Sequence, residues 1–234
     1  IPNLTGAVSI SVSEQAGCSV IADSSIKCWG SNSDVENQGL VDVATSAEST
    51  QVKVGLNFAC LVSTASSLKC WGANDAGQLG DGTLEAKSAP VAVSTLGAIQ
   101  SVDVASGSAC AVETTGAVKC WGSNLYGQLS NATQTLIKTP TVVSGITTAT
   151  KVSVGETSGC ALLANTYVTC WGTNTYGQLG NGSTNSQTAL SRPLFGAVDV
   201  SVGANSACAV LSDGQVNCWG RNGSGQLGND STTD

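Results

Sequence analysis

The stretch that decides the fold is 198–220, VDVSVGANSACAVLSDGQVNCWG. Apolar and polar residues alternate in 198–203, a short apolar run follows at 208–211, the turn residues Ser-Asp-Gly stand at 212–214, and the apolar pattern returns at 215–220. This period of two predicts a strand, a loop, a second strand, a tight hairpin and a third strand. A glycine at the end of such a three-residue turn suits a hairpin with one left-handed residue.

The same pattern recurs five times, and a pair of cysteines ten residues apart marks each copy. The pairs are Cys18 and Cys28, Cys60 and Cys70, Cys110 and Cys120, Cys160 and Cys170, and Cys208 and Cys218. Trp and Gly follow the second cysteine of every pair, so all five tryptophans occupy one repeat position. Successive pairs are 42, 50, 50 and 48 residues apart. Periods of this length with Gly and aromatic landmarks are typical of propeller-like arrays.

A loop of similar sequence follows each cysteine pair. Its copies are NDAGQLGDGT at 74–83, NLYGQLSNAT at 124–133, NTYGQLGNGS at 174–183 and NGSGQLGNDS at 222–231, with a degraded first copy, SDVENQGL, at 33–40. We call this segment the GQL loop.

The prolines indicate a fourth strand in the repeat. Pro90, Pro140 and Pro193 lie 15 to 20 residues before a cysteine. Proline cannot donate to a β-ladder and is tolerated in an exposed edge strand, so we expect an all-β propeller of five four-stranded antiparallel blades in one domain, 1–234. The predicted repeats are approximately 7–50, 51–97, 98–147, 148–196, and 197–234 together with 1–6.

The two ends of the sequence are complementary in this scheme. The chain opens with Pro2 and its strand, and it ends after a GQL loop, before a fourth strand of the last repeat. We therefore expect residues 1–6 to supply the outer strand of the fifth blade and to close the ring, which would remove the unpaired edges of an open array.

Composition excludes several classes of function. The net charge is -7, which repels a phosphate backbone, so we expect no nucleic-acid partner. No apolar run is long enough to cross a bilayer, so we expect no membrane insertion. The chain has no His, which removes the commonest acid/base group and metal ligand. No activated nucleophile or pair of acids can be assembled, so we expect neither an enzyme nor a cofactor.

The cysteine spacing predicts five disulfides, one within each pair. Two cysteines ten residues apart and centred on a three-residue turn stand opposite each other on neighbouring antiparallel strands. Zinc is disfavoured because no Cys-x-x-Cys and no His is present. Reduced, buried cysteines are the remaining alternative, but the even count favours an oxidising compartment, and we expect a secreted or surface-exposed protein.

Partner-binding residues are expected where the repeats differ. The loop between the first and second strands varies from copy to copy, and in a propeller the five copies gather on one face around the axis. Because loops on a rigid scaffold carry recognition, we select candidates for protein contacts from these loops. They are Glu14, Asn57, Phe58, Glu156 and Asn205. Ordinary solvated turns are the alternative.

Two other residue sets are candidates for glycan chemistry. Tyr126 and Tyr176 occupy equivalent positions in two GQL loops and are candidate sugar-binding residues, although they could also pack on their own loops. Asn-x-Ser/Thr sequons are candidates for N-glycosylation. They lie at Asn3, Asn131, Asn181, Asn222 and Asn229.

The order of landmarks resembles the repeat of the regulator of chromosome condensation family: an alternating strand, a Gly, a hairpin, Trp-Gly and an Asn-x-x-Gly-Gln-Leu-Gly loop. The resemblance spans nearly the whole chain. It implies a β-propeller, usually with seven blades, so part of a seven-bladed propeller is the alternative to a five-bladed ring. Nuclear members are exchange factors for a small GTPase. With one Cys pair per repeat this chain looks more like secreted bacterial members, which include an inhibitor of β-lactamases and repeats in large surface proteins.

The sequence thus favours a non-catalytic, extracellular, disulfide-stapled propeller that binds another protein, or its own copies as an assembly scaffold. A carbohydrate-binding lectin and an inhibitor of a secreted enzyme are the alternatives.

Overall fold

The computed structural model describes residues 1–30, 40–43, 49–129, 134–185 and 187–234, and the side chains of these residues except 187–193. Within these ranges the chain folds into five antiparallel sheets and contains no helix. Accordingly, no described segment is a helix that could cross a membrane.

Each sheet corresponds to one sequence repeat. The first contains β1 (Ala7–Val12), β2 (Ala16–Ile21), β3 (Ile26–Gly30) and β4 (Val41–Asp42). The second contains β5 (Ser49–Val54), β6 (Phe58–Ser63), β7 (Leu68–Gly72) and β8 (Lys87–Ala92). The third contains β9 (Ile99–Val104), β10 (Ser108–Glu113), β11 (Val118–Ser123) and β12 (Leu136–Val142). The fourth contains β13 (Ala149–Val154), β14 (Ser158–Leu163), β15 (Val168–Gly172) and β16 (Gln187–Leu194). The fifth contains β17 (Ala197–Val202), β18 (Ser206–Leu211) and β19 (Val216–Gly220).

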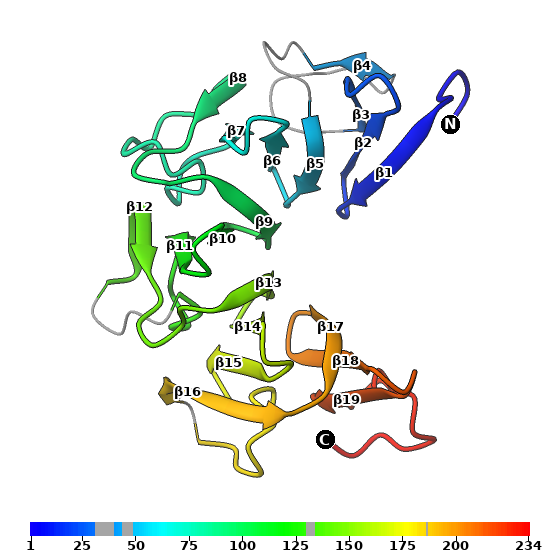
Figure 1. The fold of residues 1–234 in the computed structure, drawn as a ribbon, viewed down its shortest axis with the longest axis vertical. Helices are drawn as coiled ribbons and strands as arrows, with labels where there is room; N and C mark the ends of the chain where they lie inside the picture. The colour runs from blue at the N-terminus through cyan, green and yellow to red at the C-terminus, as the bar shows by residue number, and fades with distance from the viewer. Residues whose placement is uncertain (31–39, 44–48, 130–133, 186) are drawn as a thin grey trace.

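The sheets stand side by side like propeller blades around a common centre (Figure 1). The first strand of each sheet, β1, β5, β9, β13 or β17, lies toward the centre, and β8, β12 and β16 lie at the rim. This places Pro90, Pro140 and Pro193 in rim strands, as their lack of an N–H group predicts. The arrangement is an arc that is open between the first and last sheets.

The structure corrects the expected closure of the ring. The fifth sheet has three strands, and residues 1–6 belong to none of the described sheets. This segment is instead held by its own blade, because the Gly6 carbonyl accepts a 2.8 Å hydrogen bond from the Ala22 N–H. Gly6 has a φ of 71°, which bends the chain at this point.

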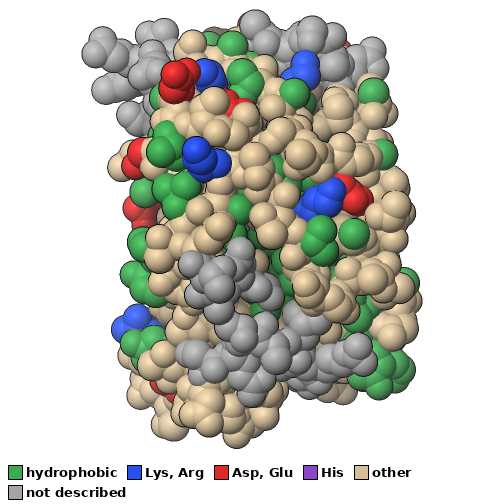
Figure 2. All heavy atoms as spheres, turned by 90° about the vertical axis from the view of Figure 1, so that its left-hand side faces the viewer, with side chains coloured by type: hydrophobic (Ala, Val, Ile, Leu, Met, Phe, Trp, Pro, Cys, Tyr) green, Lys and Arg blue, Asp and Glu red, His purple; other side chains and the backbone are tan. Residues whose placement is uncertain are grey.

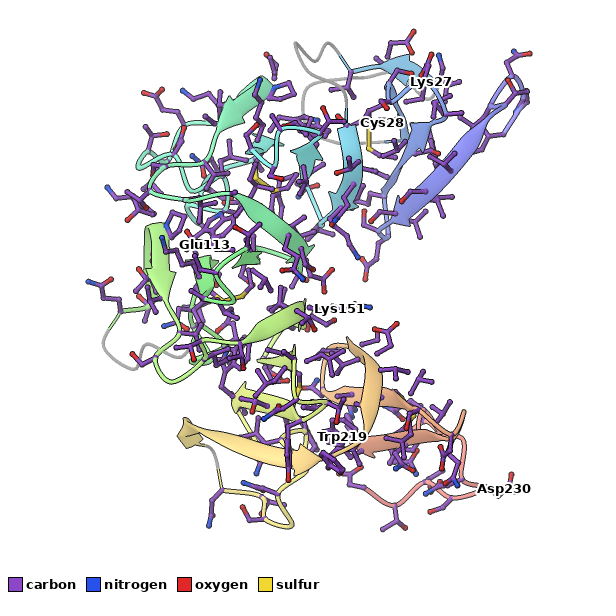
Figure 3. All side chains as sticks on the ribbon, viewed as in Figure 1. Lys27, Cys28, Glu113, Lys151, Trp219 and Asp230 are labelled. Carbon is purple, nitrogen blue, oxygen red and sulfur yellow. A yellow bond between two sulfur atoms is a disulfide. The ribbon has the colours of Figure 1, made fainter. Side chains whose placement is uncertain are left out.

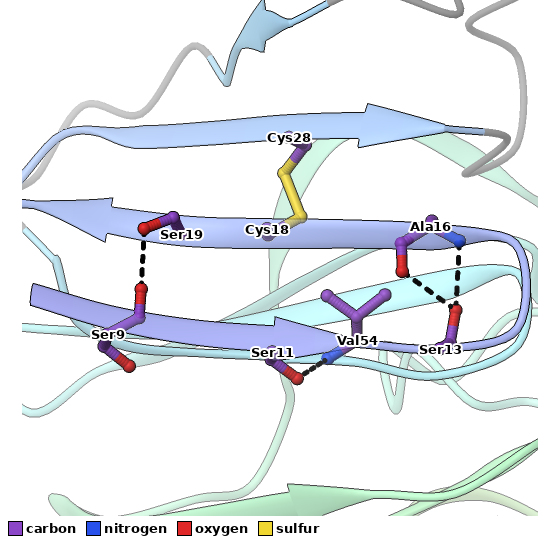
Figure 4. The surroundings of a disulfide bond; sticks show 8 residues. All are labelled: Ser9, Ser11, Ser13, Ala16, Cys18, Ser19, Cys28 and Val54. Carbon is purple, nitrogen blue, oxygen red and sulfur yellow. Dashed lines mark hydrogen bonds between the residues drawn. A yellow bond between two sulfur atoms is a disulfide. The ribbon is translucent and has the colours of Figure 1, made fainter. Parts of the chain in front are cut away.

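Every cysteine pair forms a disulfide. Cys18 lies directly opposite Cys28 in the register of β2 and β3, and the other four pairs are equivalent. Each disulfide joins the second and third strands of one blade. Figure 4 shows this arrangement in the first blade. The spacing of ten residues is therefore explained by strand register.

The position after each tryptophan requires glycine for steric reasons. Gly122 has a φ of 98°, and a Cβ atom there would lie 2.4 Å from the carbonyl oxygen of Gly107. Gly220 is equivalent, with a φ of 99° and the Asn205 carbonyl oxygen at 2.6 Å. No side chain fits so close to a backbone atom, so the Trp-Gly pair marks the point where the third strand meets the loop between the first and second strands.

Apolar residues of the first strand pack on the preceding blade. Val52, Val102, Val152 and Val200 are equivalent residues, and each is at most 2% exposed. Side chains also reach across: the Ser11 hydroxyl accepts from the Val54 N–H at 3.0 Å (Figure 4). Asp103 and Ser153 accept in the same way from Val154 and Val202.

The two ends of the arc expose the surfaces that are buried between the other blades. Ile10 in β1 is equivalent to Val52, yet it is 64% exposed. At the other end Val216 in β19 is 61% exposed, whereas its equivalents Val118 and Val168 are fully buried. The first blade thus presents an uncovered leading face and the fifth blade an uncovered trailing face.

Candidate functional site

The GQL loop is built on its first Asn and its Gln. The Oδ1 atom of Asn174 accepts from the N–H of Leu179 at 2.8 Å, and its Nδ2 atom donates to the carbonyl of Ser183 at 2.8 Å. The Oε1 atom of Gln178 accepts from the N–H of Tyr176 at 2.9 Å. Equivalent bonds organise the loops of the second, third and fifth blades. The loop is therefore a rigid structure.

The same loop locks neighbouring blades together. The indole Nε1 of Trp121 donates to the carbonyl of Gln78 at 2.9 Å, and that of Trp219 donates to the carbonyl of Gln178 at 2.9 Å. Figure 3 shows Trp219 between its own strand, β19, and the preceding blade. The tryptophans thus serve interblade packing.

Acidic residues in these loops hold turns. Asp81 accepts hydrogen bonds from the N–H and the hydroxyl of Thr83 at 2.9 and 2.8 Å. Burial raises the pKa of Asp81, but these bonds and one from Asn74 outweigh it and hold the pKa below its usual value. Asp230 lies near the C-terminal end of the chain, away from the other blades (Figure 3). No group of three or more His, Cys, Asp or Glu in the described ranges could hold a metal ion.

Loops of three blades surround a cavity of about 300 Å³. Asn57, Ser106 and Glu156 line it from the loops between first and second strands, and Asp75 and Tyr126 line it from two GQL loops. The Ser106 hydroxyl donates to Glu156 at 3.2 Å, so neighbouring loops are in direct contact. This end of the second, third and fourth blades is the candidate functional site, and we call it the loop face.

The predicted contact residues divide into three groups. Asn57 and Glu156 line the cavity. Asn205 and Glu14 are not part of the cavity wall: Asn205 Oδ1 accepts from the hydroxyl of Thr157 at 3.0 Å, and Glu14 is exposed on the first blade. Phe58 is fully buried in the core, where its ring occupies the space beside Gly55. It has no surface to offer a partner, so Phe58 leaves the candidate set.

The two candidate sugar-binding tyrosines lie in separate cavities. Tyr126 is 58% exposed and borders the cavity of the loop face. Tyr176 borders a second cavity, of about 610 Å³, together with Trp219 and Asn229. The guanidinium of Arg221 lies 5.3 Å from the centre of the Tyr176 ring, so this ring is already in contact with a cation of the chain itself.

The sequons differ in access. Asn222 is fully buried, and its Nδ2 atom donates to Asn229, Ser231 and Thr233 within its loop, which leaves no room for a glycan. Asn3 and Asn229 are exposed and Asn181 is half-buried. Asn131 lies outside the described residues.

A third cavity, of about 630 Å³, runs along the centre of the arc. The charged residues that line it, Lys53, Asp103 and Lys151, are all paired: Lys53 Nζ lies 3.3 Å from Asp103, and Lys151 contacts Asp199. Lys151 lies at the inner edge of β13 (Figure 3). These pairs connect neighbouring first strands, so we assign them to the scaffold.

The described rim strands of the blades show no concentration of charge on the side that Figure 2 shows. On the face that Figure 2 shows, the charged side chains are scattered and do not gather in a patch of one sign. A charged patch that would steer a partner is thus not visible on this side.

Several residues of the loop face were missed by sequence reasoning. Gln128 and Ser108 line the cavity, but Gln128 recurs in every well-matched GQL loop and Ser108 has a small side chain, so neither was selected as a candidate. A signal was present at Gly107, where the second, fourth and fifth blades have Asn57, Thr157 and Asn205. A glycine at a repeat position that otherwise carries a side chain indicates a cavity at that place.

Comparisons with known proteins agree with the repeat pattern. Two family models of the Regulator of chromosome condensation (RCC1) repeat match the chain. One matches residues 99–128, 149–178 and 197–226, and the other matches residues 70–112 and 168–210. Together they cover 70–128 and 149–226, which is more than half of the sequence. At the level of whole sequences, no curated protein matches.

Solved structures share the fold. Human WBSCR16 superposes with a TM-score of 0.86 at 19% identity, over 97% of this chain and 65% of that protein. Yeast RCC1 (Prp20), in its complex with Kap60, gives a TM-score of 0.83 at 16% identity, over 97% of this chain and 59% of Prp20. A second structure of Prp20p from Saccharomyces cerevisiae, described with its binding to Gsp1p and histones, gives 0.76 at 18% identity, over 91% and 57%. The chain thus spans less than two thirds of the length of these proteins.

Proposed function

Because this chain belongs to the regulator of chromosome condensation repeat family, we propose that it is a non-catalytic scaffold that binds another protein through the loop face. The observation that carries the proposal is the cavity where loops of three rigid blades meet, lined by Asn57, Glu156 and Tyr126. Recognition residues are typically found on loops that a rigid scaffold positions. The solved relatives support protein binding, since Prp20 is described with Kap60, Gsp1p and histones.

The proposal includes a location outside the cytoplasm. All ten cysteines are joined in five disulfides, one in each blade. Such bonds persist in oxidising compartments and are rare in the cytosol. We therefore propose secretion or surface display, and fractionation of the source cells with detection of the protein under non-reducing conditions tests it.

The binding proposal is tested with two matched triple variants. Replacement of Asn57, Tyr126 and Glu156 by Ala removes loop-face side chains. Replacement of Thr64, Thr115 and Ser212 by Ala changes exposed hairpins at the opposite end of the blades. In affinity capture from the extracellular proteins of the source, a partner should be retained by the wild type and the hairpin variant and lost by the loop-face variant. Equal retention by both variants would refute the proposal.

A second candidate role is assembly of copies through the ends of the arc. It is favoured by the exposed leading face around Ile10 and the exposed trailing face around Val216, because the same two faces pack together between neighbouring blades. Contacts of this head-to-tail kind produce open assemblies when they do not close. Light scattering over a range of concentrations tests this role: growth in mass that Ile10→Asp abolishes supports it, and a concentration-independent monomer refutes it.

A further inference from the structure

The cavity of the loop face exists because one repeat position lacks a side chain. In the fourth blade the hydroxyl of Thr157 fills this position and accepts a 3.2 Å hydrogen bond from Nε2 of Gln178. The third blade has Gly107 there, with φ outside the left-handed region. A Cβ atom on Gly107 would find Ser123 and Ala76 only at ordinary contact distances of 3.6 and 3.9 Å. The space is therefore a real hollow beneath the loop.

The missing side chain leaves polar groups facing the hollow. Gln128 is 3% exposed, and its Oε1 atom accepts from Tyr126, but its Nε2 atom has no acceptor among the described residues. Ser108 is 1% exposed, lines the same cavity, and its hydroxyl likewise has no partner there. Neither atom is among the fully enclosed unpaired side-chain atoms of the described residues, so both are open to the cavity, and a ligand that supplies acceptors can pair with them.

The mouth of the cavity supplies the complementary chemistry. The carboxylates of Asp75 and Glu156 each accept one hydrogen bond within the protein, from Gln78 and Ser106, and a carboxylate has about four acceptor sites. Asn57 can both donate and accept. The exposed ring of Tyr126 offers a flat apolar face at the edge.

We propose that this cavity binds one neutral or amino sugar unit of a glycan, a function beyond the protein recognition proposed above. Adjacent sugar hydroxyls both donate and accept, so they match the donors of Gln128 and Ser108 beside carboxylate and amide acceptors. The C–H face of the sugar packs on Tyr126. A volume of about 300 Å³ holds a single unit. Two carboxylates at the mouth repel uronic and sialic acids. A basic protein side chain fits less well, since it would bring no acceptor for Gln128.

The test uses the native chain and four probes: the methyl glycosides of N-acetylglucosamine, mannose and galactose, and glucuronate. Saturation-transfer NMR and calorimetry should detect millimolar binding of at least one neutral glycoside and none of glucuronate. Gly107→Thr should fill the hollow, supply an acceptor for Gln128, and weaken binding at least tenfold with an unchanged melting temperature.

Gly223→Thr is the matched control, because Gly223 lies in a GQL loop and a Cβ atom added there would have no other atom within 4 Å. It should bind like the wild type. Tyr126→Ala, a change of an exposed residue, should also weaken binding, and it keeps the test decisive if Gly107→Thr misfolds. Failure of all three neutral glycosides, undiminished binding by both site variants, or binding of a lysine-rich peptide in place of sugars would overturn the proposal. These outcomes are independent of protein capture by the loop face.

Discussion

The indole Nε1 of Trp171 donates a 2.8 Å hydrogen bond to the backbone carbonyl of Gln128, 43 residues earlier in the chain. Trp171 belongs to the third strand of one blade and Gln128 to the GQL loop of the preceding blade. The two most recognisable landmarks of the repeat are therefore the two halves of a single interblade contact. This explains why both recur together.

This contact predicts a difference between two tryptophans. Trp171→Phe leaves the buried Gln128 carbonyl without its donor and should lower the free energy of unfolding by about 1 to 3 kcal/mol. Trp29 lies in the first blade, with no preceding blade in the described structure, so Trp29→Phe should cost clearly less. Urea unfolding of both variants checks this, and equal losses would contradict the assigned role of the hydrogen bond.

The open ends of the arc predict a second pair of unequal effects. Val102 is 1% exposed between two blades, and Val102→Ala should destabilise the protein by about 2 kcal/mol. The equivalent Ile10 is exposed, and Ile10→Ala should change stability by less than about 0.5 kcal/mol. Thermal unfolding at low protein concentration measures both. A large loss with Ile10→Ala would mean that the leading face is covered in solution.

The environment of Glu113 predicts that the stability of the fold depends on pH. Burial raises the pKa of its carboxyl, but the Gly97 N–H at 2.7 Å and Lys119 at 2.8 Å outweigh burial and hold the pKa below its usual value. A lowered folded-state pKa stabilises the protein above the unfolded value, about 4.3, and this stabilisation is lost as pH falls through the folded value. Glu113→Gln should therefore cost about 1 kcal/mol at pH 7 and clearly less at pH 2. An equal cost at both pH values would exclude this linkage.

Replacement of Thr169 is predicted to increase stability. Its hydroxyl is buried in β15 without a hydrogen-bond partner. Thr169→Val removes the unpaired group at nearly constant volume and should raise stability by about 1 kcal/mol. Thr173→Val is the control, since the Thr173 hydroxyl donates to the Tyr126 carbonyl at 2.8 Å and its loss should destabilise. Chemical denaturation decides, and destabilisation by Thr169→Val would show that its hydroxyl has a partner.

The sequence predicts the features that depend on local pattern. Alternating residues, the ten-residue cysteine spacing and the edge prolines correctly indicated strands, disulfides and rim strands, because each depends on neighbours in one sheet. The expected closure by residues 1–6 failed because it rested on the order of repeats, while a local bond between Gly6 and Ala22 holds that segment. The GQL loop was recognised, but its contact with the next Trp could not be read from either segment alone.

The sequence predicted part of the candidate site, because some of its residues are recognised from their position in the repeat. The position of Asn57 and Glu156 in variable loops was sufficient to place them on the loop face. Phe58 is adjacent to Asn57 in sequence, yet it is the first residue of β6 and its side chain is buried in the core. A difference of one residue along the chain therefore decides whether a side chain lines the cavity or packs in the core. The cavity itself arises from a side chain that is missing at Gly107, which only a comparison of blades in space reveals.

The central claim, that recognition takes place on the loop face, is tested most directly by hydrogen exchange of the native protein with and without its captured partner. Our account predicts slower exchange in 56–57, 106–107 and 156–157 and in the GQL loops of the second and third blades, with hairpins 64–67 and 114–117 unchanged. Protection confined to those hairpins or to the rim strands β8 and β12 would contradict it.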